Sequence, residues 1–490
     1  MNLLVKAHKL TAIGALLSVA GCANFSGIES QSTMLTPQSL QADNGQADAA
    51  AFPQQQWWQT FGDLQLNALI EQAIAQNPNL KIAQGRMREA QAAIAGADSA
   101  RYPQVNASAQ STRERLSANS IYPPPLGGST VSMNSATLSA SWQLDLLGKQ
   151  RAALEAAIGQ SRAAQADRQA AQVMLAANVA QQYFGLARLQ AQQGIKRKLL
   201  QNAEQNAQLV NQRVSAGVDS ALALHQAQAE VPQLRRDLAA LDEQVALARH
   251  ALAVLVGAEP DATAQVTAHL PTHIQTQSPE RIPAELLGHR ADVVAARWRV
   301  ESDLQGVREA RADFYPNINL SAFAGFEAIG MAQWLRADSR TVGAGPAISL
   351  PIFDAGRLRG QLQGRTARAD TAIESYNATV LNALREVADQ LSSWKMLQTQ
   401  LQEQKAAMRQ VDAAYDLALA RYRNGLTNYL TVLIAANAVM QQHSTLIDLQ
   451  TRLCDTDAGL MLALGGGYAP SAQDMKISKT AIENVAKVAK

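Results

Sequence analysis

Residues 136–151, with the sequence Ala-Thr-Leu-Ser-Ala-Ser-Trp-Gln-Leu-Asp-Leu-Leu-Gly-Lys-Gln-Arg, combine two periodicities in one short stretch. From Ala136 to Asp145 apolar and polar residues alternate, and a period of two predicts a strand with one apolar and one polar face. At Gly148 a helical pattern without proline begins and continues to about Arg213. Such a helix would extend about 100 Å, which is longer than a globular core needs.

The second half of the chain repeats this arrangement. Four pairs recur about 208 residues apart, namely Gly148 and Gly356, Arg151 and Arg359, Arg213 and Arg421, and Gly217 and Gly425. Nearer the start of each copy, Tyr102-Pro103 returns as Tyr315-Pro316. A unit this long is too large for a solenoid repeat and predicts two tandem halves that follow the same path.

Each copy contains a second alternating segment that can pair with the first. Residues 105–111 alternate in the first copy and residues 318–324 in the second, where residues 348–352 provide the partner. We therefore expect one hairpin at about 104–145 and another at about 316–353. Strands of roughly ten residues have the length that a tilted strand needs to cross a bilayer.

The remaining segments divide the chain. Near Leu64 a helical pattern begins that continues to about Ala100, and Tyr102-Pro103 ends it. The predicted division is a signal peptide at 1–21, a polar lead at 22–63, a first repeat at 64–257, a linker at 258–283, a second repeat at 284–465 and a tail at 466–490.

The N-terminus reads as an export signal. Lys6 and Lys9 precede an apolar run that ends at Cys22. The residues Val-Ala-Gly-Cys resemble a bacterial lipobox, which implies that Cys22 is lipidated and becomes the mature N-terminus. The alternative is an ordinary signal peptide with a cysteine there by chance. Cys454 lies within a helical pattern, and we expect it to be a buried core residue.

Composition excludes several functions. A formal charge of +2 argues against a nucleic-acid partner. The histidines are scattered, no Gly-x-Ser-x-Gly motif is present, and Gly465-Gly466-Gly467 ends a helical pattern without opening another. We therefore predict no catalytic residues, no metal site and no cofactor. After the signal there is no apolar run of transmembrane length, so any membrane crossing would be made by strands.

Two hairpins cannot close a barrel by themselves. Four strands leave two open edges, whose backbone groups lipid cannot satisfy. Three chains would supply twelve strands, an even number within the range of outer-membrane barrels. The predicted fold is thus α+β, with a trimeric β-barrel continued by a long α-helical barrel and with an internal twofold repeat.

The order of these features resembles the outer-membrane efflux factors of the TolC, OprM and NodT type. The resemblance rests on the lipobox, on the two strand pairs that each precede a Gly-x-x-Arg start at Gly148 and Gly356, on the turn from Arg421 to Leu430, and on Leu464-Gly465-Gly466-Gly467-Tyr468. It extends over the mature chain to about Pro470, and within the family it is greatest for MdtP-like lipoproteins.

This resemblance implies a trimeric exit duct that is anchored in the outer membrane and extends into the periplasm. The duct would conduct drugs or other toxic small molecules from a periplasmic adaptor and an inner-membrane pump, which is of the resistance-nodulation-division or major facilitator class. The protein itself would perform no chemistry, because the pump supplies the energy.

The resemblance also assigns roles to the two helix turns. Adaptor contact is implied for Gly217, Val218, Gly425 and Leu426, although a glycine at a helix reversal can also serve the turn alone. A periplasmic gate is implied for Arg421, Tyr422 and Leu430, where the leucines would form an apolar constriction and Arg421 and Tyr422 would form polar links between neighbouring helices. Some relatives have acidic residues where this chain has Thr431 and Ile434, so the chain lacks that acidic ring.

Two alternatives belong to other classes of protein. A structural surface lipoprotein with long coiled coils explains the helices but not two amphipathic hairpins at matching places in a repeat. A periplasmic adaptor would carry a β-rich lipoyl-like section and one helical hairpin, and the sequence shows neither pattern.

Overall fold

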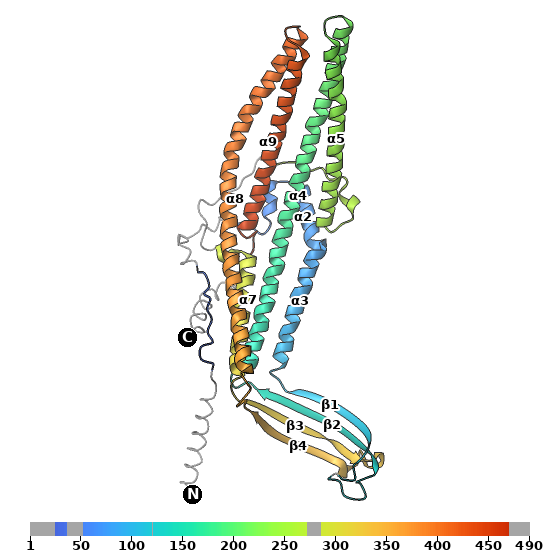
Figure 1. Ribbon diagram of the computed structural model, residues 1–490, viewed down its shortest axis with the longest axis vertical. Helices are drawn as coiled ribbons and strands as arrows, with labels where there is room; N and C mark the ends of the chain where they lie inside the picture. The colour runs from blue at the N-terminus through green and yellow to red at the C-terminus, as the bar shows by residue number, and fades with distance from the viewer. Residues whose placement is uncertain (1–24, 37–51, 120, 272–285, 470–490) are drawn as a thin grey trace.

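The computed structural model describes residues 25–36, 52–119, 121–271 and 286–469 of the chain. Long helices form one end of the molecule and a four-stranded sheet forms the other (Figure 1). The helices are α2 (Leu64–Gln76), α3 (Pro78–Ser99), α4 (Lys149–Ser215), α5 (Ala221–Leu255), α6 (Leu286–His289), α7 (Ala291–Ala312), α8 (Arg357–Arg423) and α9 (Tyr429–Ala463). The strands are β1 (Gln104–Arg115), β2 (Thr130–Leu144), β3 (Asn317–Ile329) and β4 (Arg340–Ser349).

The internal repeat of the sequence is present in the helices. The helices α4 and α8 both have 67 residues, α5 and α9 both have 35, and α3 and α7 both have 22. Each member of a pair begins at the position that the sequence spacing gives for the other. The long proline-free helix predicted from Gly148 is one continuous helix.

The four strands form one antiparallel sheet in the order β1-β2-β3-β4. This confirms the two predicted hairpins and adds that β2 and β3 pair with each other. In the register, Leu138 lies opposite Ala107 and Ala324, whereas its neighbour Ser139 lies opposite Asn106 and Phe323. The strands extend farther than the alternation predicts, because beyond Ser111 polar residues occupy both faces and the pattern disappears.

The register sorts the side chains onto two faces. One face carries Val105, Ala107, Ala109, Ala136, Leu138, Ala140, Trp142, Ile318, Leu320, Ala322, Ala324, Phe326, Val342, Ala344, Pro346 and Ile348. We call this set the apolar band, and on the same face at its ends Leu144 lies opposite Ile318 and Arg340 lies opposite Phe326. Opposite the band, the other face carries Asn106, Ser108, Gln110, Thr137, Ser139, Ser141, Gln143, Asn319, Ser321, Phe323, Gly325, Thr341, Gly343, Gly345 and Ala347. We call this set the polar face, and beside it, in the row of Gln110, lie Ser135 and Glu327.

One expected helix is two. The pattern from Leu64 to Ala100 predicts a continuous helix, but the structure breaks it at Asn77, between α2 and α3. Pro78 disfavours helical geometry at the preceding residue, and the Asn77 side chain caps α3 by accepting hydrogen bonds from the Asn79 and Leu80 amides. The sequence Asn-Pro carried this signal, and the continuous apolar face concealed it.

The break lets each repeat fasten its helices in the same way. The Asn77 side-chain amide donates to the carbonyl of Leu255 at the end of α5, at 2.8 Å. The equivalent residue in the second repeat, Arg290, donates to the carbonyl of Ala463 at the end of α9, at 3.2 Å. In both repeats the end of the second long helix is therefore held at the start of the short one.

Three consecutive glycines complete the second of these junctions. A Cβ added to Gly465 would lie 1.9 Å from the carbonyl oxygen of His289, and one at Gly467 would lie 2.4 Å from that of Gln54. A Cβ at Gly466 would lie 2.0 Å from Cγ1 of Val173 in α4. The backbone after α9 thus passes against three separate segments at distances that exclude any side chain.

The lead does not consist only of polar residues. Trp57, Trp58 and Phe61 form a 3-10 helix that is buried in the core with α2, α4 and α9. The signal peptide at 1–21, Cys22, residues 272–283 of the predicted linker and residues 470–490 of the predicted tail lie outside the described residues.

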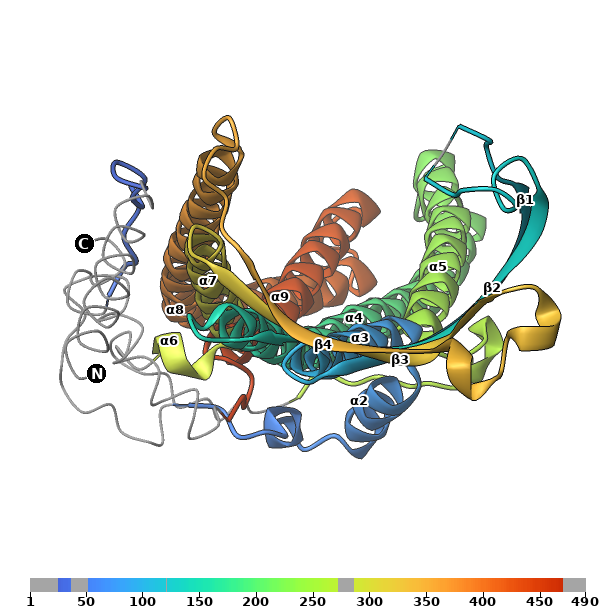
Figure 2. The ribbon, with the colours of Figure 1, turned by 90° about the horizontal axis from the view of Figure 1, so that it is seen from below.

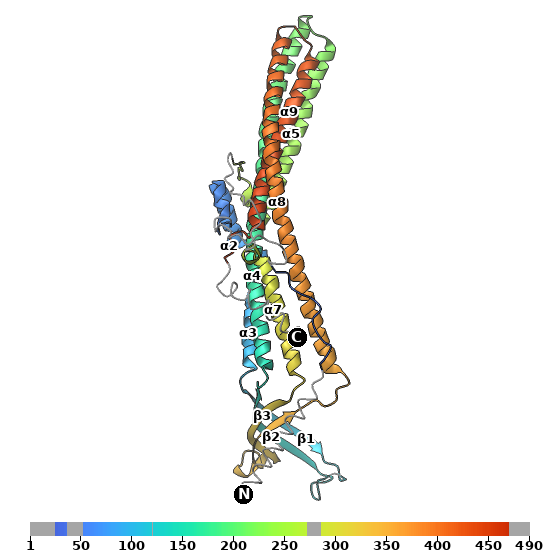
Figure 3. The same ribbon diagram turned by 90° about the vertical axis from the view of Figure 1, so that its left-hand side faces the viewer.

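Residues 25–36 lie along α7 and α8 (Figure 3). Ile28 is buried between these helices, and the Asn377 side chain binds the Leu35 amide and the Thr33 carbonyl. Phe25 contacts Phe314 edge to face, with ring centroids 5.7 Å apart, where α7 ends and β3 is about to begin. This segment therefore spans much of the lower half of α8.

Seen from the end that carries the sheet, the helices and the strands follow the same arc (Figure 2). The side of the arc at α8 and the side at α3 and α5 are the two edges of the helix layer. Within the described ranges, no helix combines the length and the apolar character that a membrane span requires.

Candidate functional site

Two helix turns form the end of the molecule farthest from the sheet (Figures 1 and 3). One joins α4 to α5 and the other joins α8 to α9. In each, a glycine at φ +75° follows the helix, and the next amide binds the carbonyl five residues earlier, Val218 to Arg213 and Leu426 to Arg421, both at 2.8 Å. Residues with a side chain rarely adopt this left-handed backbone conformation. Gly217 and Gly425 are therefore needed for the turns themselves, whether or not they also contact another molecule.

The next helix of each hairpin starts with a capping side chain. Ser220 accepts a hydrogen bond from the Ala223 amide, and Asn428 accepts one from the Thr431 amide. A tight reversal followed at once by a capped helix gives both turns a defined backbone shape.

The residues that the family resemblance assigns to adaptor contact all lie on the surface of these turns. Gly217 and Gly425 are exposed, and Val218 and Leu426 are 60% and 68% exposed. Large apolar side chains at this exposure are suited to contact with another molecule. Their contact with an adaptor stays a prediction.

The three residues assigned to a gate do not form one cluster within a single copy of the chain. Tyr422 is fully buried, whereas Leu430 is 45% exposed and Arg421 is exposed. No side-chain hydrogen bond or ion pair with a described residue involves Arg421. The gate therefore stays a prediction, and it concerns an assembly in which several copies of the chain bring these residues together.

Tyr422 belongs to a network that joins the two repeats. Its hydroxyl donates to Oδ2 of Asp219, in the first turn, at 2.6 Å. Arg213 Nε also donates to this oxygen, at 2.9 Å, and the Arg213 guanidinium lies 4.9 Å from the centroid of the Tyr422 ring. Although burial opposes it, the two hydrogen bonds lower the pKa of Asp219 below its usual value. A charged, hydrogen-bonded carboxylate thus links the two turns.

A second tyrosine, on α9, forms a similar link beside the first. The Tyr429 hydroxyl donates to Oε2 of Glu230 in α5, at 3.0 Å, and its ring meets Tyr422 edge to face. Burial raises the pKa of Glu230, and the hydrogen bond from Tyr429 opposes that shift. Val210, Ala227 and Val432 surround the two rings. The tip of the molecule therefore has its own small core between the two hairpins.

Sequence reasoning missed Asp219, Glu230 and Tyr429. A signal was present in the differences between the repeats. The second copy has Tyr422 and Tyr429 where the first has Val214 and Ala221, and the first has Asp219 and Glu230 where the second has Thr427 and Ala438. Two hydroxyl donors in one copy match two carboxylates in the other.

We expect a double-mutant cycle of Tyr422→Phe and Asp219→Ala to give a coupling energy of about 1.5–3 kcal/mol, since the hydrogen bond has a charged acceptor. The measurement is protection of the turn amides in hydrogen exchange. Because the pKa of Asp219 is lowered in the fold, this stabilisation is present above the unfolded pKa of about 3.9 and is lost only as pH falls through the lower folded value.

The control is Tyr415→Phe, a tyrosine in the same cluster. It should leave the protection of residues 217–222 unchanged. A coupling energy near zero, or one that disappears between pH 7 and pH 5, contradicts the proposed link.

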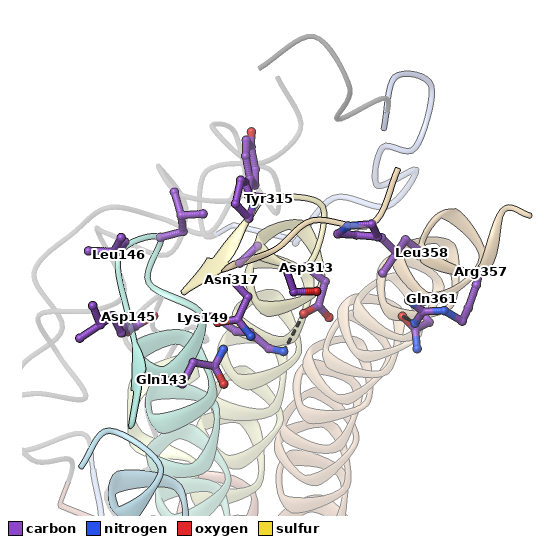
Figure 4. A pocket seen from close by; sticks show the side chains of 16 residues that line it. Gln143, Asp145, Leu146, Lys149, Asp313, Tyr315, Asn317, Arg357, Leu358 and Gln361 are labelled. Atoms are coloured by element: carbon purple, nitrogen blue, oxygen red, sulfur yellow. Dashed lines mark hydrogen bonds and ion pairs between the residues drawn. The ribbon is translucent and has the colours of Figure 1, made fainter. Parts of the chain in front are cut away.

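A polar pocket lies at the other end of the helices, where they meet the sheet (Figure 4). It has a volume of about 380 Å³ and is lined by the ends of β2 and α7 and the starts of α4 and α8. Lys149 and Asp313 form an ion pair across it at 2.6 Å, and Asp145 accepts hydrogen bonds from the Gln150 and Arg151 amides at the start of α4. These contacts hold the transition from strand to helix that the sequence predicts here.

Within the described part of the chain, no three His, Cys, Asp or Glu side chains are arranged to hold a metal ion. Cys454 is 1% exposed, which confirms its expected place in the core.

Comparison with known proteins identifies the family. The family model for outer membrane efflux proteins matches residues 69–258 and 282–466. The multidrug resistance outer membrane protein MdtP of Escherichia coli strain K12 is 32% identical over 475 residues, which cover 93% of this chain and 95% of MdtP. The fusaric acid resistance protein FusA of Burkholderia cepacia is 36% identical over 367 residues, which cover 73% of this chain and 69% of FusA.

A solved structure supports the same assignment. The outer membrane protein VceC of Vibrio cholerae superimposes with a TM-score of 0.79 at 35% identity, covering 85% of this chain and 100% of VceC. Both the sequence and the arrangement of helices and strands therefore agree with the resemblance that the repeat and its motifs indicated. The chain belongs to the family of outer membrane efflux proteins and shares their outer-membrane location.

Proposed function

We propose that three copies of this chain close into a barrel that forms the exit duct of a tripartite efflux system. The observation that carries the proposal is the strand register, which places the apolar band on one side of the sheet and mainly polar or small residues on the other. A sheet with these two faces suits lipid on one side and a water-filled lumen on the other.

The edges of the sheet support the number of copies. In the described chain β1 pairs only with β2, and β4 pairs only with β3. Unpaired backbone groups are costly in lipid, and closure by three chains would pair every edge in a barrel of twelve strands. The arc of helices, with α8 at one side and α3 and α5 at the other, would close in the same way into a helical barrel in the periplasm (Figure 2).

The turns are the proposed contact with a periplasmic adaptor, through Gly217, Val218, Gly425 and Leu426. Their exposed apolar side chains support this, as does their place at the end farthest from the sheet. The adaptor would join the duct to an inner-membrane pump of the resistance-nodulation-division or major facilitator class. The duct would conduct drugs or other toxic small molecules passively, without chemistry of its own.

Lipidation of Cys22 would add an anchor to the barrel. The position of Phe25 supports it, because this residue packs on Phe314 where α7 leads into the sheet. Each methylene buried in the bilayer contributes about 0.8 kcal/mol, so several acyl chains hold firmly.

We expect Leu430→Ala to open the duct. Three copies of Leu430 near the axis would form an apolar constriction that disfavours water, and the smaller side chain widens it. The measurement is single-channel conductance of the detergent-extracted trimer in planar bilayers. The native protein should show a small, mostly closed conductance, and the variant a conductance several times larger.

Leu417→Ala is the matched control, because Leu417 is a 60% exposed leucine on α8 that is not assigned to the gate. It should behave as the native protein does. Pores that Leu430→Ala leaves unchanged would retain the duct and place the gate elsewhere. Trimeric protein that forms no pore in any variant would overturn the proposed function and favour a structural lipoprotein.

A further inference from the structure

The polar face of the sheet, which lies on the side opposite the apolar band, has an unusual composition. Its positions carry hydroxyl, amide, alanine and glycine residues and one phenylalanine, and the first charged residue beyond Gly325 on this face of β3 is Glu327, in the row of Gln110. Charged rings are the usual source of charge selectivity in pores, and in this part of the passage only Glu327, at one end, could supply one. If the sheet closes as proposed, solutes meet an uncharged surface between Asn319 and Gly325.

One large apolar side chain interrupts this face. Phe323 points to the polar side, opposite Ser139 on β2 and Gly343 on β4, and it is 46% exposed. Phe326 lies on the opposite side, within the apolar band, so the phenylalanines of β3 divide between the two faces. An exposed aromatic ring among polar neighbours is more informative than an apolar residue that faces lipid.

The surroundings of this ring leave space beside it. Its edge lies over Gly343, where an added Cβ would be 2.6 Å from Cε1 of Phe323. The next polar-face position on β4, Gly345, would accept a Cβ with no atom within 4 Å, and it lies opposite the small Ser321. The result is a glycine-floored step next to an exposed aromatic ring, which we call the Phe323 step.

The ring also has a structural role, since an aromatic side chain over a glycine in a neighbouring strand supports the sheet. That role accounts for the contact with Gly343. It accounts neither for the missing side chain at Gly345 nor for a ring that is almost half exposed.

We propose that the Phe323 step is a contact site for planar aromatic solutes on their way through the membrane part of the duct. The inference rests on the proposed trimer, because only closure of the sheet turns its polar face into a lumen. A flat ring can stack on Phe323 and rest over Gly345, whereas a puckered aliphatic ring of the same charge fits neither surface.

The test uses the full chain, reconstituted as trimers in lipid nanodiscs, and saturation-transfer difference NMR. The probes are naphthalene-2-sulfonate and cyclohexanesulfonate, with empty nanodiscs as the blank. The naphthalene probe should bind the native protein, and its affinity should fall about two- to tenfold in Phe323→Ser, the range that loss of one aromatic contact produces.

Gly345→Val separates binding from stability. The valine fills the step without touching the contact between Phe323 and Gly343, and a β-branched residue suits a strand. It should reduce naphthalene binding as Phe323→Ser does, but the variant trimer should dissociate at the same temperature as the native trimer. Ser139→Ala, at the position opposite Phe323 on β2, should leave binding unchanged.

The outcomes distinguish failure of the proposed duct from failure of the proposed aromatic site. A sample that is not trimeric overturns the proposed duct and this inference with it. A trimer that binds both sulfonates equally, or that keeps its naphthalene signal in both Phe323→Ser and Gly345→Val, overturns only the aromatic site. If Phe323→Ser loses binding and Gly345→Val does not, Phe323 serves the packing of the sheet, and this result also overturns the site.

Discussion

Replacing Gly465 by alanine should destabilise the assembled protein by about 2–5 kcal/mol per chain or prevent its folding. Two costs add. The backbone φ of +100° strains any L-residue by about 1–2 kcal/mol. The new Cβ would also lie 1.9 Å from the His289 carbonyl oxygen, and overpacking against backbone costs about 1–3 kcal/mol. The measurement is the temperature at which trimers dissociate, followed with the helical circular dichroism signal.

Gly217→Ala is the matched control, because Gly217 has a φ of +75° and no atom within 4 Å of an added Cβ. It should cost only about 1–2 kcal/mol, the conformational part. Gly257→Ala, the counterpart of Gly465 in the first repeat, meets the Gln76 backbone at 2.9 Å and should rank between them. Equal losses at Gly217 and Gly465 would show that the close approach to His289 does not contribute.

Asp457→Asn should stabilise the protein above neutral pH by up to about 4 kcal/mol per chain. The Asp457 side chain is 1% exposed within α9, and burial raises the pKa of its carboxyl to about 7. The unfolded chain releases this proton near pH 4, but the folded chain holds it until about pH 7. Native stability therefore falls as pH rises between these values, which is the reverse of a salt-bridged aspartate.

The control is Asp448→Asn on the same helix, whose carboxylate is 46% exposed and forms an ion pair with Arg188. It should leave this pH dependence in place. The dissociation temperature of the trimer is measured from pH 4 to pH 9 in all three proteins. A native curve that does not decline between pH 4 and pH 7, or one that Asp457→Asn leaves unchanged, would contradict the assignment.

Much of the fold was predictable because it depends on local periodicity. Alternation at Ala136–Asp145 determines which face of a strand is apolar, and the absence of proline after Gly148 permits a long helix. Because the sequence repeats, each of these patterns occurs twice, and each copy predicts the same element independently. The division at Asn77 was missed because a capping asparagine before proline is one local signal against a continuous apolar face.

The candidate site was only partly predictable. Gly217 and Gly425 are at the turns because helix reversal needs a left-handed residue, and a sequence pattern shows this directly. For Tyr422 the family resemblance implied a polar link between neighbouring helices, but the sequence did not show that its partner in the fold is Asp219, a residue 203 positions away. Such pairing depends on how two hairpins pack side by side, which spacing along the chain does not encode.

The sequence by itself therefore determined the strands, the long helices, the twofold repeat and the family, because each depends on residues close together or on motifs in order. Tertiary structure alone decided which side chains meet: Arg290 with the end of α9, Tyr429 with Glu230, and Phe323 with Gly343. These contacts join segments far apart in the chain, and their partners are selected by the shape and register of the packed elements rather than by any local pattern.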